Sequence, residues 1–170
     1  MTTTETGPSR GALLQALRAS RDVVITTVRG MSPAQLEEGR YENGWTARQI
    51  LAHLASIEWT YPRLIDVARE APETPEPGGD PAATRTMRGG NDAYNERQVA
   101  KRAHLSAADL LAEFERNRAA TIQAVEATDE ALLRRRIRSA GGVTGDLAAV
   151  LHLVAVDHVL GHARDIASPR

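Results

Sequence analysis

Apolar residues recur at three-, four- and seven-residue spacing along most of the chain, which is the period of amphipathic helices. One stripe covers residues 11–29, and a short helix that starts with a proline is expected over 33–38. A second long stripe covers 46–70, where Pro62 is expected to kink or restart the helix because it lacks an N–H. No alternating apolar and polar run reaches strand length. The pattern therefore predicts an all-α protein.

The second half of the chain continues the helical pattern. A polar helix is expected over 91–104, and a longer amphipathic helix begins after the capping residue Ser106. A short helix is expected over 129–136. The last helix, over 144–167 with Thr144 as its cap, is apolar on nearly every side and should lie in the middle of a bundle. Four main helices of this kind predict a four-helix bundle with one long crossover.

The chain has the length of one domain, and we expect residues 1–170 to form it, with residues 1–9 as a flexible N-terminal arm. Residues 71–90 are rich in proline and contain two Gly-Gly pairs. This composition predicts a long surface loop, and a loop of that length could cover a site.

Composition narrows the possible functions. Hydrophobic residues make up 42% of the chain, and 21 basic against 22 acidic residues leave a net charge of −1, which argues against a nucleic-acid partner. The absence of cysteine excludes disulfides, thiolate zinc sites and a cysteine nucleophile. No apolar run is long enough to span a membrane, and the polar start does not resemble a secretory signal. We therefore expect a cytoplasmic protein.

Three of the five histidines, His53, His158 and His162, stand where a metal site would need them. His158 and His162 lie four residues apart on the most apolar helix, so their rings should project from one face about 6 Å apart. His53 lies in the buried stripe of another helix. Neutral imidazoles converging from two helices can bind one divalent ion at about 2.0–2.1 Å each. Three histidine ligands leave a fourth position open, which is typical of catalytic zinc sites.

A histidine on an apolar stripe is more often an ordinary core residue, and a pair at four-residue spacing can arise by chance. Three buried imidazoles, however, need three sets of hydrogen-bond partners, and one metal ion provides for all of them. His152 lies about 120° around the helix from His158 and is expected to pack elsewhere or reach solvent. His104, at the end of a polar helix, is expected to be solvated.

Three segments resemble the DinB/YfiT-like superfamily of metal-dependent enzymes. Residues 44–54, GWTARQILAHL, resemble its Trp-Thr…His-Leu segment, and residues 156–166, VDHVLGHARDI, resemble its closing His-x-x-x-His helix. Residues 91–97, NDAYNER, resemble the branch that includes the N-terminal domain of mycothiol-dependent maleylpyruvate isomerase. The resemblance spans nearly the whole chain.

The resemblance implies a four-helix bundle of unusual connectivity, often dimeric, with His53, His158 and His162 as metal ligands. Zinc is the expected ion, with nickel or iron as alternatives. The resemblance also implies thiol transfer or isomerisation with a low-molecular-weight thiol such as mycothiol or bacillithiol. The chain ends shortly after His162, so we expect the second domain of the isomerase to be absent, which weakens maleylpyruvate as a substrate.

The first functional hypothesis is a metal-dependent thiol S-transferase that acts on a small electrophile. A divalent cation deprotonates a coordinated thiol at neutral pH, so this chemistry needs no separate base. Asn95 could donate a hydrogen bond to the ligand, although an amide that faces solvent fits its position equally well. Asp157 and Asp165 flank the histidines and could orient an imidazole N–H, a task that backbone carbonyls also perform.

The second hypothesis is a metal-dependent hydrolase of a small ester or amide. It lacks an obvious carboxylate base, because Glu58 lies about 140° around the helix from His53 and should point away. The third is a helical binding module without enzymatic activity. Trp45 and Trp59 are expected in the core or at the interface of a homodimer rather than at a pocket. The arginines at 134–138 are expected at a solvated helix end rather than at an anion site.

Overall fold

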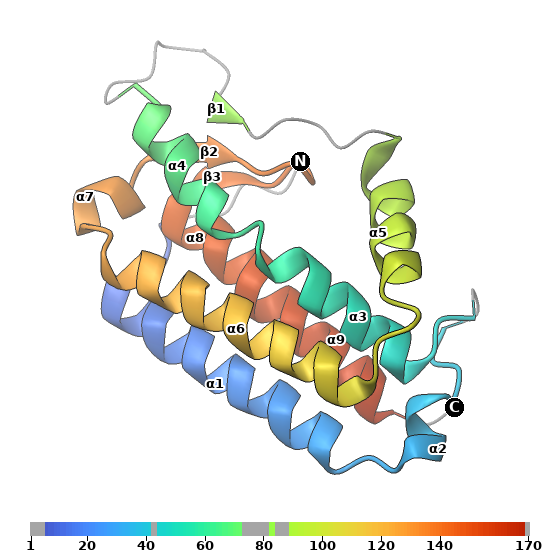
Figure 1. The fold of residues 1–170 in the computed structure, drawn as a ribbon. Helices are drawn as coiled ribbons and strands as arrows, with labels where there is room; N and C mark the ends of the chain where they lie inside the picture. The colour runs from blue at the N-terminus through green and yellow to red at the C-terminus, as the bar shows by residue number, and fades with distance from the viewer. Residues whose placement is uncertain (1–5, 42–43, 73–81, 84–88, 169–170) are drawn as a thin grey trace.

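A computed structural model describes residues 6–41, 44–72, 82–83 and 89–168 of the chain. The chain is mostly helical, and its long helices lie side by side as a four-helix bundle (Figure 1). The members of the bundle are α1 (Arg10–Arg29), α3 (Ala47–Glu58), α6 (Ala107–Glu126) and a continuous C-terminal helix composed of α8 (Leu147–His152), the π-helix η1 (Leu153–Asp157) and α9 (His158–Ala167). The predicted fold class is therefore confirmed.

Among the described residues, four shorter helices connect or extend the bundle: α2 (Pro33–Leu36), α4 (Pro62–Glu70), α5 (Gly90–Lys101) and α7 (Glu130–Leu133). α3 ends at Glu58, and α4 starts afresh at Pro62, whose missing N–H costs nothing in a first turn. Pro62 thus restarts the helix, which is one of the two outcomes that the sequence predicted.

The helices begin where side chains can accept hydrogen bonds from the first free N–H groups. Capping boxes join Ser32 to Gln35 and Thr46 to Gln49. The Thr46 cap fixes the start of α3, the helix that carries His53. Asp146, and not the predicted Thr144, caps the C-terminal helix through a bond from Ala149 N.

One corner of the mainly helical fold holds a small sheet that the sequence pattern did not predict. β1 (Ala82–Ala83) pairs in parallel with β2 (Arg136–Arg138), which pairs antiparallel with β3 (Thr144–Asp146). β2 replaces the end of the helix predicted over 129–136. Only Ile137 of β2 is buried, between two exposed arginines, so the alternation is too short to register as a strand pattern.

The described end of the expected N-terminal arm is held by hydrogen bonds. In this arm, Gly7 N donates to Asp146 Oδ2 at 2.9 Å, and the Arg134 guanidinium donates to the carbonyls of Gly7 and Pro8. Of the expected loop over 71–90, most lies outside the described residues. No helix in the described part of the chain is long and apolar enough to cross a membrane.

Candidate metal centre

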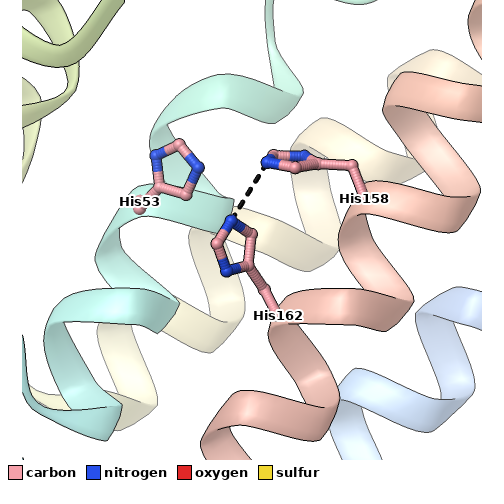
Figure 2. Close-up of side chains that lie close together, drawn as sticks. All are labelled: His53, His158 and His162. Carbon is pink, nitrogen blue, oxygen red and sulfur yellow. Dashed lines mark hydrogen bonds between the residues drawn. The ribbon is translucent and has the colours of Figure 1, made fainter. Parts of the chain in front are cut away.

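Three histidine side chains from two helices of the bundle meet at one point (Figure 2). His53 comes from α3, and His158 and His162 come from successive turns of α9. The ring centroids are 5.5 Å apart for His53 and His158, 5.0 Å for His53 and His162, and 4.5 Å for His158 and His162. One nitrogen of each ring lies within 4.8 Å of one nitrogen of each of the others. The sequence spacing predicted this convergence.

The π-helix immediately before His158 sets the local geometry of the site. Its wide turn leaves carbonyl groups available to side chains, and single π-turns of this kind are frequent at functional sites. The Val154 carbonyl accepts a hydrogen bond from the Tyr61 hydroxyl at 2.7 Å and bonds to the ring of His158. The Ala155 carbonyl accepts a bond from Arg118 Nη2 at 2.8 Å. Side chains of neighbouring helices therefore hold the turn that presents His158.

Hydrogen bonds on the outer side of the pair orient both α9 histidines. The Tyr41 hydroxyl lies 2.7 Å from His162 Nδ1, and Asp165 Oδ2 is 3.3 Å from the same nitrogen. Since the Val154 carbonyl can only accept, the proton of the His158 ring that bonds to it is on that outer side. The inner nitrogens, Nε2 of His158 and Nε2 of His162, face each other at 3.0 Å.

A divalent cation fits this arrangement. When both rings carry their protons on the outer nitrogens, the two inner nitrogens present lone pairs to each other, and a positive ion between them removes the repulsion. Ligand nitrogens about 2.0–2.1 Å from a tetrahedral ion are about 3.3 Å apart, close to the 3.0 Å between His158 and His162. One nitrogen of His53 faces the pair, while its buried Nδ1 has no hydrogen-bond partner among the described residues (Figure 2).

Burial keeps the cluster in the protonation state that a metal requires. Loss of solvent lowers the pKa of His53 to about 3 and that of His158 to about 4, and the charges of neighbouring histidines lower both further. Burial also lowers the pKa of His162, against the opposing effect of Asp165. The rings are therefore neutral at pH 7, and a cation can bind without first displacing a proton.

Aromatic rings border the cluster on one side. The ring of Trp45 lies 5.6 Å from that of His53, and Tyr41 lies 6.3 Å from Trp45. The Trp45 indole N–H donates to Glu96 Oε1 at 3.1 Å, which links this border to α5. Asn95 is the preceding residue of α5 and is half-buried. Trp45 therefore lies at the site and not in a remote part of the core. Tyr41 also lies at the site, and the sequence pattern did not predict it.

Other candidates from the sequence lie away from the cluster. His152 contacts Asp157 at 3.3 Å, and His104 is exposed beyond the end of α5. Asp157 thus does not orient a cluster histidine, whereas Asp165 is in position to do so. Trp59 is 41% exposed and packs under the Arg63 guanidinium.

Glu58 is fully buried against Arg118. Its carboxylate is therefore not available as a base at the cluster, as its angle on the helix predicted. In the 134–138 arginine run, Arg135 donates to the Ala68 and Ala71 carbonyls.

The fold and the cluster define a class of protein: a four-helix bundle whose interior carries three neutral histidines suited to a divalent ion. Residues 16–166 match the model of the DinB superfamily, and the chain belongs to this superfamily. No match was found among curated proteins.

Solved structures with the same fold include two named proteins. YfiT from Bacillus subtilis, described as a probable metal-dependent hydrolase with an unusual four-helix bundle topology, aligns over 98% of this chain and 89% of its own, with 20% identity and a TM-score of 0.73. The mycothiol-dependent maleylpyruvate isomerase aligns over 99% of this chain, with 20% identity and a TM-score of 0.72. The present chain spans 64% of the isomerase chain.

Proposed function

We propose that this protein is a metal-dependent thiol S-transferase in which His53, His158 and His162 bind one divalent ion, with zinc as the preferred metal. The observation that carries the proposal is the inward-facing pair of Nε2 atoms, 3.0 Å apart, with a third imidazole beside them. A divalent ion held by three neutral ligands keeps an open position and lowers the pKa of a thiol or water that binds there.

The surroundings of the histidines favour a thiol over water as the nucleophile. Within the part of the chain that the structure describes, the cluster that could hold an ion contains histidines alone, and the nearby Glu58 is bound to Arg118. Hydrolysis benefits from a carboxylate base beside the water, whereas a thiol bound to a cation is already ionised. The proposed substrate is therefore a low-molecular-weight thiol of the mycothiol or bacillithiol type together with a small electrophile.

The chain's own residues have distinct tasks in this proposal. The three histidines hold the ion, and Tyr41, Asp165 and the Val154 carbonyl orient two of them. Trp45 borders the open side and excludes water from it. Asn95 donates a hydrogen bond to the bound ligand from α5. In the transfer step the sulfur–carbon bond forms, the leaving group departs with the electron pair of its bond to carbon, and the thiol proton passes to solvent.

The test combines metal analysis with a thiol-transfer assay. Protein purified without an affinity tag should hold about one divalent ion per chain, and His158→Ala should lose it while the exposed His104→Ala keeps it. The loaded protein should then consume mycothiol or bacillithiol with chlorodinitrobenzene, releasing one chloride for each thiol used. Less than a tenth of an equivalent of metal after reconstitution would contradict the proposal.

A hydrolase is the second candidate, because the structurally similar YfiT is described as a probable metal-dependent hydrolase. Ester cleavage by the loaded protein in the absence of any thiol, lost in His158→Ala, would favour this activity. Metal binding without turnover in either assay would instead favour a binding module.

A further inference from the structure

Tyr41 reaches the histidine cluster from a segment that belongs to no helix. The segment before α3 is fixed at its base by a bridge between Gly39 and Thr46 and by the bond from Arg40 N to the Trp45 carbonyl at 2.7 Å. A turn hydrogen bond from Gly44 N to the Tyr41 carbonyl, at 3.1 Å, also belongs to this segment. This backbone framework places the Tyr41 side chain in a defined position.

The neighbouring residue attaches this segment to α9. Arg40 is 8% exposed, and its Nε donates to the Ile166 carbonyl at 3.0 Å, while Nη2 donates to the Gln35 carbonyl at 3.2 Å. Because Ile166 lies one turn beyond His162 on α9, the Arg40 contact brings the next residue, Tyr41, against the outer edge of that histidine. The meeting of Tyr41 and His162 is therefore a consequence of a buried anchor.

The Tyr41 hydroxyl forms the middle of a three-residue hydrogen-bond chain. It lies 2.5 Å from Asp165 Oδ2 and 2.7 Å from His162 Nδ1. An ionised carboxylate can only accept, so the hydroxyl proton points to Asp165. The hydroxyl oxygen then accepts from His162 Nδ1–H, which leaves the lone pair of Nε2 directed toward His158 and His53.

We propose that Tyr41 is a positioning residue of the metal site, which fixes His162 in the Nδ1–H form with Nε2 free to bind the ion. Asp165 assists it, because this carboxylate accepts the Tyr41 proton and itself lies 3.3 Å from His162 Nδ1. This inference rests on the proposed function, because its purpose is the ligation of a divalent ion. A phenol between carboxylate and imidazole performs the task that a carboxylate or carbonyl usually performs alone.

The first measurement reads the position of the proton on His162 without any metal. Long-range proton–nitrogen NMR spectra of the metal-free protein should assign the proton of His162 to Nδ1 in the wild type. Tyr41→Phe removes only the hydroxyl and should shift His162 toward a mixture of the two forms, whereas Tyr94→Phe on α5 should leave it unchanged. A wild-type spectrum with the proton on Nε2 would overturn the inference.

The second measurement reads the site with Co²⁺, whose visible absorption reports the number and geometry of its ligands. Tyr41→Phe should weaken Co²⁺ binding by about tenfold and alter the absorption bands, since loss of such outer partners costs about 10–100-fold in metal affinity. Asp165→Asn should also weaken binding. The double variant should bind more weakly than either single variant, because Asp165 lies 3.3 Å from His162 Nδ1 and can still accept its proton when the phenol is gone.

The outcomes separate positioning from simple packing. If Tyr41→Phe unfolds at a lower denaturant concentration but binds Co²⁺ with wild-type affinity and spectrum, Tyr41 is structural and the inference is overturned. If the wild type binds no Co²⁺, the metal site itself is overturned, and the positioning role falls with it. If the wild type binds Co²⁺ and the Tyr41→Phe spectrum is altered, the result supports both the metal site and the positioning role of Tyr41.

Discussion

Glu58 and Arg118 form an ion pair in the centre of the bundle, with neither side chain exposed to solvent. Arg118 Nε lies 2.7 Å from Glu58 Oε1, and Nη2 donates to Oε2 at 2.9 Å. The same guanidinium donates to the Leu17 carbonyl on α1 and to the Ala155 carbonyl in the π-helix. Arg118, itself on α6, thus contacts the three other helices of the bundle.

Loss of this arginine should strongly destabilise the fold. Arg118→Leu leaves the Glu58 carboxylate buried without its cationic partner, and removing one member of a buried pair costs about 3–5 kcal/mol. Urea unfolding would measure the change, with Arg29→Ala as the control. Arg29 pairs with Glu115 at the exposed surface, where a pair contributes about 0–1 kcal/mol. A loss for Arg118→Leu as small as that of the control would contradict the argument.

Stability of the metal-free protein should fall as the pH decreases below neutrality. Burial lowers the pKa of His53 to about 3 and of His158 to about 4, whereas both titrate near 6.5 when unfolded. Between these values the unfolded chain binds protons that the folded chain does not, so the free energy of unfolding is highest above pH 6.5 and decreases toward pH 4. Urea unfolding between pH 7.5 and about 5 should show this decrease, and His53→Leu should reduce its slope. An unchanged slope would argue against a buried neutral His53.

Divalent metal should stabilise the folded chain through the three histidines. A ligand at one hundred times its Kd raises the free energy of unfolding by about 2.7 kcal/mol when it binds only the folded state. Thermal unfolding with and without Zn²⁺ would measure the effect. His162→Ala should abolish it, and the half-exposed His152→Ala should retain it, since His152 lies outside the cluster and bonds to Asp157. Equal stabilisation of both variants would place the ion elsewhere.

The Tyr61 hydroxyl should contribute to stability but not to metal stoichiometry. Tyr61→Phe removes one hydrogen bond to the Val154 carbonyl and leaves the bond from the His158 ring in place. We expect a loss of about 0.5–1.5 kcal/mol, the usual net value of such a bond, with one ion still bound per chain. Tyr94→Phe provides the matched control. Loss of the ion in Tyr61→Phe would mean that the carbonyl alone cannot orient His158.

The regular parts of the fold could be predicted because their signals are local. The three-histidine cluster depends on a four-residue spacing on one helix and on His53 in the apolar stripe of another, and both are properties of an ideal helix. Capping boxes such as that of Thr46 and Gln49 involve residues three apart, so short-range pattern reasoning finds them.

The features that escaped prediction depend on contacts between distant residues. Tyr41 and His162 are 121 positions apart, and their contact requires the Arg40 anchor on Ile166. The pairing of β1 with β2 likewise joins residues far apart in the chain, in strands too short to show alternation. No periodicity of the sequence marks Tyr41 as a partner of the histidines.

The π-helix within the C-terminal helix also changes how this sequence must be aligned. A turn with one additional residue rotates everything after it by about 100° relative to a regular α-helix. A helical-wheel projection drawn from Leu147 without this insertion would misplace His158 and His162 by about 100° around the helix. Residues before 153 and after 157 therefore belong to two different helical registers. Deletion of one residue between them would leave the helix continuous but would rotate His158 and His162 relative to His53.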